Sequence, residues 1–525
     1  MRGTEVVPGL VIVLAVAVTP LAACAFTTTV GGHSVDLDST LSAREVFEEN
    51  GATKHDRTLE QLRVRLAASL TDWLRFDSTT LGTNGGPTLK ADRAGVFNLD
   101  DAFQDVSQAV DFEEAYFDVF LPSVDFRIGK QKVAWGKLDR SQPNDLINTL
   151  TYTDPFLDEE AERKIGVPAV QASYYLPTSA WIAESRVTAV WVPQYVPYRF
   201  SSATCNVQSG VSHCDVERWY PPAAVPPTNL DVPAGIVQIG GQPSPAFRAP
   251  IAFRTQNVPS PSWRVENNEI GLRYAALIGD VDAAAYYFHG FDPQPAFRLT
   301  AEALGQADPR SPIGVDLSTL QGSTVVSPEY HHIDAGGADF AYAFDRFTVR
   351  GEGAYISGRP FTRDLRTLVE DPRQLVGPVL TALQQLADPR SGGHAPVDLP
   401  PSVVTREAVE WGIGGDYTYA GYMLLLQVNQ TDVLHNDVPL LIKDIETRLL
   451  ANLRKSFVSD RLQTQLVALH SIESDYTLLR PTVSYQLTDN VSAQAGYLFI
   501  AGRAESVIGQ YRRNDEGWVR FAYKL

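Results

Sequence analysis

Apolar residues recur at every second position through many segments of this chain. Near the C-terminus, Val519, Phe521 and Tyr523 are separated by single residues that are polar or small. The stretches 58–70 and 265–277 alternate in the same way. A period of two places all apolar side chains of a segment on one face, which is typical of a β-strand. The pattern therefore predicts a protein built mainly of strands that have one apolar and one polar face.

Segments of this kind number about eighteen, with about sixteen as the lower limit of the prediction. An even number of strands returns both ends of an antiparallel barrel to the same, periplasmic side. The predicted strands cover residues 33–45, 58–70, 72–81, 111–121, 124–134, 166–176, 180–192, 265–277, 281–291, 332–344, 346–357, 406–419, 421–431, 445–457, 460–471, 476–487, 491–502 and 515–525.

The connections between these segments are either very short or very long. Turns such as Gly279-Asp280 and Asp345-Arg346 join strands in pairs, whereas long connections cover about 193–263, 292–331 and 357–405. A soluble sandwich also alternates, but a compact domain rarely holds several structureless loops of this length. Short turns at one end and long loops at the other are typical of an outer-membrane barrel, which closes because an open edge in hydrocarbon leaves backbone groups unpaired. The expected fold is all-β: a transmembrane antiparallel up-and-down β-barrel with short periplasmic turns and long extracellular loops.

Composition removes several other classes of protein. Hydrophobic residues make up 44% of the chain and aromatic residues 10%, which excludes a disordered protein. The formal net charge of −18 argues against a nucleic-acid partner, because phosphate binding requires a basic face. No run of about 20 apolar residues follows the N-terminus, so a helical membrane protein is excluded as well.

The N-terminus predicts export from the cytoplasm. Residues 10–23 are apolar except for Thr19 and Pro20, a run that fits a secretory signal but is too short to span a bilayer. Cleavage before Cys24 would make that residue a lipidated N-terminus, because residues 21–24 resemble a lipobox. Ordinary cleavage after Ala25 satisfies the small-x-small rule equally well. Residues 1–25 are therefore expected to be a signal peptide, and 26–525 a single barrel domain.

Two cysteines remain for disulfide chemistry. Cys205 and Cys214 lie close together in a stretch rich in Pro and Ser, and an exported chain enters an oxidising compartment. A disulfide closing a small loop is the expected outcome, with two free thiols as the alternative. A zinc site is not expected, because His213 is adjacent but a fourth ligand is missing.

Several motifs together resemble a family of porin-like outer-membrane barrels of Gram-negative bacteria. The family is mostly of unknown function and is related in pattern to alginate-export barrels. The motifs are Gly129-Lys130-Gln131 followed by Trp135-Gly136, then Asn144-Asp145-Leu146, Arg163–Pro168, Arg480–Leu487 and Gly509–Leu525. Two positions depart from the family pattern: Lys130 replaces a common Arg, and Leu525 replaces the terminal Phe that assembly machinery usually recognises.

The resemblance implies an outer-membrane location and a set of partners. Such a barrel contacts outer-membrane lipid and lipopolysaccharide, and its C-terminal strand is recognised by the barrel assembly machinery. The resemblance also implies anionic, aromatic or hydrophobic solutes, with periplasmic or inner-membrane transport components as further partners. Lys130 and Lys132 are expected to point outward, where they would reach lipopolysaccharide phosphates or form solvated rim charges.

Alternation also predicts which charged residues line the lumen, because charge on the lipid face is costly. Two interpretations remain open for the inward arginines. They form a ladder that guides an anionic solute, since guanidinium groups bind carboxylates and phosphates, or they pair with carboxylates and stabilise the wall. The candidate lumen residues are Arg63, Arg65, Arg127, Gln131, Arg273, Arg350, Glu352, Arg448, Arg454 and Arg520, with Glu269 and Asp416 also facing inward.

The long connections are candidates for a constriction or lid. Residues 193–262 contain twelve of the 34 prolines and are not expected to form a regular ladder. The stretch after Asp371-Pro372 predicts a helix, with Leu380, Leu383, Leu386 and Ala387 as its apolar stripe. A lid formed by this stretch predicts that deletion of about 366–395 raises single-channel conductance, whereas an external cap predicts no change. Trp135, at the end of a strand, is expected to narrow the mouth, to lie at the membrane interface or to pack against a loop.

No arrangement of residues in the sequence indicates catalysis, a cofactor or a metal site. The expected function is a porin-like channel, without enzymatic activity, for passive passage of a small anionic or hydrophobic/aromatic solute. Alternatives are an export conduit for an acidic polysaccharide, a plugged structural or adhesive barrel and, last, a barrel hydrolase.

Overall fold

The computed structural model describes most of the chain between Phe26 and Lys524. The undescribed residues include the expected signal peptide with Cys24, the helix start at Asp371-Pro372, and Leu525, so these predictions lie outside the described part. The described residues are 26–524 without 31, 49–56, 86–107, 153, 180, 202, 209–210, 217–218, 220–228, 233, 235–237, 240–241, 244–245, 262, 312–313 and 365–375.

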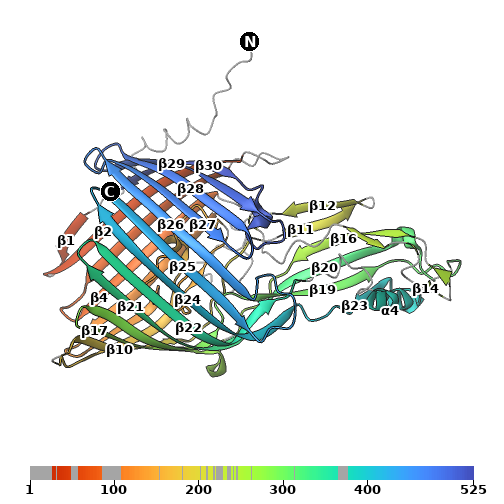
Figure 1. Ribbon diagram of the computed structural model, residues 1–525, viewed down its shortest axis with the longest axis horizontal. Coiled ribbons are helices and arrows are strands. Elements are labelled where there is room, and N and C mark those ends of the chain that lie inside the picture. Colours follow the sequence, from red (N-terminus) through yellow and green to blue (C-terminus); the bar gives the residue numbers. More distant parts are fainter. Residues whose placement is uncertain are drawn as a thin grey trace, which may run out of the picture.

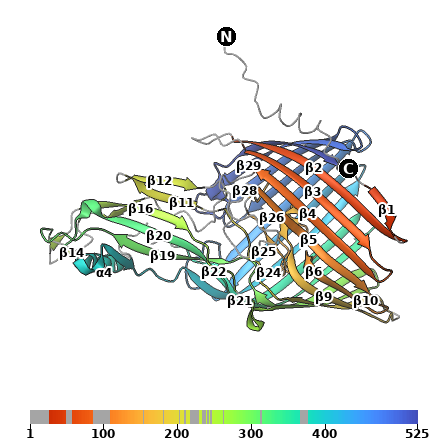
Figure 2. The same cartoon turned by 180° about the vertical axis from the view of Figure 1, so that it is seen from behind.

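Eighteen antiparallel strands of the described chain form a closed ring, which confirms the predicted barrel (Figures 1 and 2). Each strand pairs with the next along the ring, and β2 closes the ring by pairing with β30. The strands are β2 (His33–Glu48), β3 (Arg57–Ser69), β4 (Leu74–Gly85), β5 (Gln108–Phe120), β6 (Val124–Gln131), β9 (Val167–Leu176), β10 (Ile182–Val192), β17 (Glu269–Ile278), β18 (Val281–Phe291), β21 (His332–Phe344), β22 (Phe347–Thr362), β24 (Val403–Tyr419), β25 (Tyr422–Leu434), β26 (Ile445–Phe457), β27 (Leu462–Ser471), β28 (Tyr476–Gln486), β29 (Val491–Gly502) and β30 (Glu516–Lys524).

A short additional strand continues the ladder of β2. β1 (Phe26–Val30) pairs with β2 from Val30↔His33 to Phe26↔Leu37, whereas β30 pairs with β2 from Lys524↔Thr40 onward. β1 therefore covers the backbone edge of β2 that lies beyond the end of β30. This pairing limits the length of exposed strand edge, which would otherwise recruit other chains.

The two faces of the barrel wall follow the predicted alternation. On β17 the side chains of Ile270, Leu272 and Tyr274 are 46, 44 and 40% exposed on the outside, while Arg273 between them points inward. Large apolar side chains of this kind remain exposed all around the ring. Exposed apolar surface of this extent is costly in water and is the surface expected to face lipid.

Short turns join the strands at one end of the barrel. Several turns place a residue in the left-handed region, such as Gly279 (φ 60°), Asp345 (φ 51°) and Ala420 (φ 47°), as tight hairpins require. The C-terminus and β1 lie at this end (Figure 1).

The long connections at the opposite end build a second sheet, which projects away from the barrel (Figures 1 and 2). The sheet joins three connections that are distant in sequence, and β16 pairs with β20 in parallel. The expectation that 193–262 forms no regular ladder is therefore wrong: its prolines fall mostly between its strands. The elements of this extracellular sheet are β11 (Ala203–Gln208), β12 (Val211–Val216), β13 (Asn229–Val232), β16 (Phe247–Thr255), β19 (Ala296–Leu304), β20 (Gln321–Glu329) and β23 (His394–Val397), with the small pair β14 (Gln238–Ile239) and β15 (Gln242–Pro243) nearby.

The predicted helix packs against this sheet. In α4 (Val376–Leu386), Leu383 and Leu386 are buried, and they pack in one cluster with Val315 and Leu320. Figure 1 shows α4 at the end of the sheet that is far from the barrel. Three residues of the predicted stripe, Leu383, Leu386 and Ala387, therefore pack on the extracellular sheet, and α4 does not lie in the lumen.

None of the helices in the described ranges is both long enough and apolar enough to cross a bilayer.

Candidate functional site

One connection folds into the barrel. Residues 132–166 join β6 to β9, and their base is closed where β7 (Thr149–Leu150) pairs with β8 (Lys164–Ile165). On either side of β7, the connection extends as two arms that contact inward-facing side chains of strands on distant parts of the ring. We call residues 133–148 the first arm and residues 151–163 the second arm.

Glycines in the wall make room for the first arm. A Cβ on Gly271 of β17 would lie 2.5 Å from Cη2 of Trp135, and one on Gly412 of β24 would lie 2.5 Å from Cδ1 of Leu138. The indole of Trp135 also packs on Tyr286, with ring centroids 5.4 Å apart. Trp135 is 4% exposed. Its function is therefore to dock the first arm on the wall.

Polar contacts attach the first arm to the same part of the wall. Lys137 Nζ lies 2.8 Å from Asp282 and 3.0 Å from Asp339, and its backbone N–H donates to Glu352 Oε2 at 2.7 Å. Asp139 lies 3.1 Å from Arg350. Burial raises the pKa of Asp139, and Arg350 opposes that rise. The predicted lumen residues Arg350 and Glu352 are thus partners of the arm.

The second arm is anchored across the lumen. Asp158 forms an ion pair with Arg44 of β2, and Glu159 forms one with Arg480 of β28. Glu159 also lies 2.8 Å from Arg140, which joins the second arm to the first. Burial acts to raise the pKa of Asp158, but the adjacent Arg44 outweighs it and holds that pKa below its usual range. Arg480 and Arg140 likewise outweigh burial and lower the pKa of Glu159.

Three of the other predicted lumen arginines have a carboxylate partner, and Arg350 has a second one. The nitrogen–oxygen distances are 2.7 Å for Arg63–Glu113, 3.2 Å for Arg65–Asp77, 2.7 Å for Arg127–Asp118 and 2.7 Å for Arg350–Asp416. Glu269 accepts from the backbone N–H of Phe291 at 3.0 Å, and Gln131 donates to the Ala169 carbonyl at 2.9 Å, so both are structural. Within the described part of the chain, no carboxylate lies within ion-pair distance of four predicted arginines: Arg273, Arg448, Arg454 and Arg520.

The two lysines of the Gly-Lys-Gln motif do not point outward. Lys130 is 4% exposed and lies 2.8 Å from Asp111, and Lys132 lies 3.6 Å from Glu113. Lys130 and Gln131 are both buried at the end of β6, where the strand leads into the internal connection, so strict alternation ends there. The prediction that these lysines reach lipopolysaccharide is therefore wrong.

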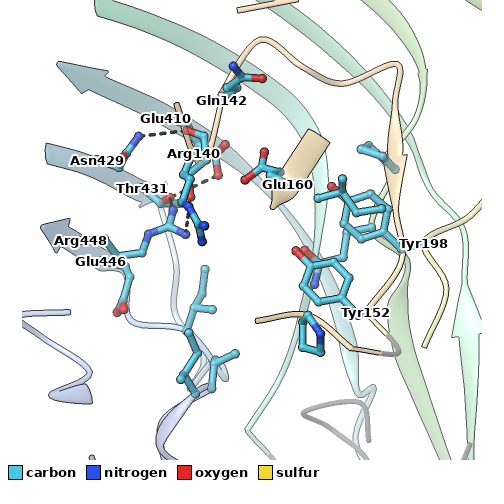
Figure 3. Close-up of a pocket in the computed structure, with 18 of the residues that line it drawn as sticks. Arg140, Gln142, Tyr152, Glu160, Tyr198, Glu410, Asn429, Thr431, Glu446 and Arg448 are labelled. Atoms are coloured by element: carbon cyan, nitrogen blue, oxygen red, sulfur yellow. Dashed lines mark hydrogen bonds between the residues drawn. The ribbon is translucent and has the colours of Figure 1, made fainter. Parts of the chain in front are cut away.

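A cavity of about 430 Å³ lies between the two arms and the wall formed by β24 to β28. On the wall side, Arg448 donates to Thr431 Oγ1 at 3.3 Å and to Ser141 Oγ at 3.4 Å. Figure 3 shows Arg140 and Arg448 converging on this side, with Glu160 and two tyrosine rings across from them. The cavity therefore has a charged wall and an aromatic wall.

The aromatic wall is a compact stack. The ring of Tyr152 lies 5.4 Å from that of Tyr198 and is stacked on Phe200, also at 5.4 Å. The guanidinium of Arg163 lies 5.2 Å from the centroid of the Tyr152 ring. Burial raises the pKa of both tyrosines, so their hydroxyls stay neutral. Such a surface can pack against a flat apolar group.

Sequence reasoning missed this internal connection, although signals for it were present. Gln131, Trp135, Gly136, Asn144 and Asp145 supported the resemblance to porin-like barrels, and all of them belong to this connection or its entry. Asn144 donates to the Ala338 carbonyl at 3.1 Å, and buried Asp145 pairs with Lys164 at the base. Burial raises the pKa of Asp145 to about 6. In the described residues, no group of three or more His, Cys, Asp or Glu is placed to bind a metal ion.

Comparisons with known proteins gave structural similarity only. No family model and no curated protein matches the chain, and the expected relation to alginate-export barrels finds no support. Solved structures that it resembles include OmpF of Salmonella typhi, in a complex with daunomycin (10% identity, TM-score 0.38, 95% of this chain and 100% of that chain), OccD3 of Pseudomonas aeruginosa (8%, 0.42, 96% and 93%) and OccAB4 of Acinetobacter baumannii (7%, 0.45, 94% and 98%).

Three properties of the chain itself define its class of barrel. Its strands close into a large antiparallel ring, its exterior is apolar, and its turns are short at one end and long at the other. These three properties make the chain an outer-membrane β-barrel with a porin-like fold.

Proposed function

We propose that this barrel is a channel for passive passage of a small anionic or hydrophobic/aromatic solute across the outer membrane. One observation carries the proposal: a two-armed connection lies inside a closed barrel and is attached to opposite sides of its wall. A barrel of about eighteen strands is wide enough to hold water unless it is filled. The arms reduce that width to a path bordered by charged and aromatic side chains, which can select solutes by size and charge.

The charges along this path favour an anionic solute. Where an arginine already binds a carboxylate, its charge is largely compensated. Arg273, Arg454 and Arg520 face inward without such a partner in the described residues, so they can contribute positive potential. Transport by this route requires no covalent step. A polysaccharide conduit would need a continuous arginine track, whereas the pairs at Arg63, Arg65 and Arg127 interrupt it.

Planar-bilayer recordings of the purified full-length protein test the proposal. We expect ionic current through the wild type, and a severalfold higher single-channel conductance when residues 152–162 of the second arm are deleted. Deletion of the eleven residues 376–386 of α4 is the matched control, and we expect it to leave conductance unchanged because α4 packs on the extracellular sheet. Absence of current from the wild type and from the arm deletion would contradict a channel and support a plugged barrel.

A further inference from the structure

The cavity between the arms is lined by a cation and an anion that have no charged partner among the described residues. Within the described part of the chain, the Arg448 side chain donates only to the hydroxyls of Thr431 and Ser141. The side chain of Glu160, the first residue of the short helix α2 (Glu160–Arg163), forms no hydrogen bond or ion pair within the described residues. Both residues line the cavity, and Figure 3 shows them on opposite sides of it.

The other charged groups that line the cavity are already engaged. Arg359 lies 2.7 Å from Glu410 and 3.3 Å from Asp292. Glu446 accepts from Ser471 and Ser474, each at 2.5 Å. Asp145 pairs with Lys164, Arg140 with Glu159, and the Arg163 guanidinium lies over Tyr152. Arg163 and Glu446 also have no charged partner among the described residues, but both are buried. Arg448 and Glu160 are half-buried, so they are the cation and the anion that remain open to a ligand.

The aromatic wall lines the same cavity as both of these charges. The Tyr152 hydroxyl, whose pKa is raised by burial, is also affected by Glu160, which raises that pKa, and by Arg448, which lowers it. Tyr152 therefore lies within electrostatic range of both groups. A ligand that contacts the rings of Tyr152 and Tyr198 could reach both charges at once.

We propose that this cavity binds a small zwitterion with an aromatic ring, such as an aromatic amino acid. Its carboxylate would bind Arg448 beside the hydroxyls of Thr431 and Ser141, and its ammonium group would bind Glu160. Its ring would pack on Tyr152 and Tyr198. A cavity of about 430 Å³ is within the size range of small-molecule sites. This inference rests on the proposed channel for its physiological meaning, but the binding itself does not require ion conduction.

Three probes that share a phenyl ring test the contributions of Arg448 and Glu160 independently. Phenylalanine carries both charges, 3-phenylpropionate only the carboxylate, and phenethylamine only the ammonium group. Isothermal titration of the detergent-solubilised full-length barrel measures each affinity. We expect the wild type to bind phenylalanine about tenfold more tightly than either analogue. Each analogue lacks one of the two charged groups and therefore forms one charged hydrogen bond fewer with the site.

Two substitutions in the cavity should each weaken the binding of a different pair of probes. Arg448→Gln should weaken phenylalanine and 3-phenylpropionate about tenfold and leave phenethylamine unchanged, whereas Glu160→Gln should weaken phenylalanine and phenethylamine and leave 3-phenylpropionate unchanged. Arg298→Gln and Glu302→Gln, on β19 of the extracellular sheet, are matched controls that should change none of the three affinities. If Arg448→Gln does not fold, as judged by heat-modifiable gel migration, Arg448→Lys replaces it and should give a smaller loss for the same two probes.

The proposal is overturned if wild type binds 3-phenylpropionate as tightly as phenylalanine, if no probe binds, or if either substitution weakens all three probes equally. Bilayer conductance is recorded separately, so that failure of the zwitterion site can be distinguished from failure of the proposed channel. A barrel that conducts but shows no such selectivity refutes the zwitterion site alone. A barrel that binds with this selectivity but never conducts refutes the channel and retains the site.

Discussion

At the scale of single residues, the inner wall depends on positions where a side chain is absent. Gly271 and Gly412 are inward positions of their strands, and the structure places Trp135 and Leu138 of the first arm against them. A glycine weakens a strand on its own, so its presence there indicates close approach by another segment. Close packing of this kind leaves little room for an added methyl group.

Gly271→Ala should therefore destabilise the protein by about 1–3 kcal/mol, because the new methyl overlaps the indole of Trp135. The matched control is Gly336→Ala on β21, where a Cβ would have no neighbour closer than 4.0 Å. Urea-induced unfolding in lipid vesicles, followed by gel mobility, gives the free energies of unfolding. Equal stability of the two variants would mean that Trp135 is not docked on Gly271.

The two cysteines of the extracellular sheet give a second prediction at this scale. Cys205 and Cys214 are direct partners in the antiparallel register of β11 and β12. Direct partners have Cα atoms about 4.5–5.5 Å apart, which is within the range of a disulfide. Mass spectrometry of peptides from the exported protein, without reductant, should show Cys205 linked to Cys214. Full alkylation of both thiols under those conditions would contradict the prediction.

At the scale of elements, the sequence was informative wherever structure repeats locally. Each predicted strand from 33–45 to 515–525 corresponds to a barrel strand, because alternation is imposed by lipid on one side of the wall. The first and second arms follow no period: Trp135, Leu138 and Leu157 are buried by contacts with distant strands. The parallel pairing of β16 with β20 likewise joins separate connections, so no local pattern could indicate it.

The anchors of the second arm lead to a prediction about pH. The pKa values of Asp158 and Glu159 are lowered, so their attachment to Arg44 and Arg480 is complete above the usual carboxyl range. The attachment is lost only as the pH falls through the lowered pKa values, because protonation then removes the negative charge of each carboxylate. Conductance should therefore stay constant from pH 7.5 to about pH 5 and rise below about pH 4, where the arm is released.

Asp158→Asn at neutral pH should reproduce the acid state of the wild type, because it removes the charge without changing the size of the side chain. Asp308→Asn, in the extracellular connection that links β19 to β20, is a control that should behave as wild type. Single-channel recordings across this pH range provide the measurement. An increase in conductance already at pH 6 would instead implicate the base of the arms, where the pKa of Asp145 is raised to about 6.

At the scale of the whole molecule, net charge and pore charge are separate quantities. The chain carries a formal charge of −18, which alone would favour cations. However, charges separated by more than about 8–10 Å of physiological saline are largely screened, so selectivity depends on groups that border the path. We expect the inward-facing Arg454 and Arg520 to border it, and Arg520 lies directly opposite Arg44 in the register of β2 and β30.

We therefore expect a barrel that prefers anions despite its acidic composition. In a gradient of potassium chloride, the reversal potential should have the sign of chloride selectivity, and the double substitution Arg454→Gln and Arg520→Gln should shift it toward zero. Arg298→Gln with Arg310→Gln, on the extracellular side, removes the same total charge and should leave the reversal potential unchanged. If both pairs shift it equally, the overall charge of the molecule governs selectivity, and the inward arginines do not. If the wild type prefers cations, the carboxylates of the two arms dominate the path, and the proposed anionic solute is wrong.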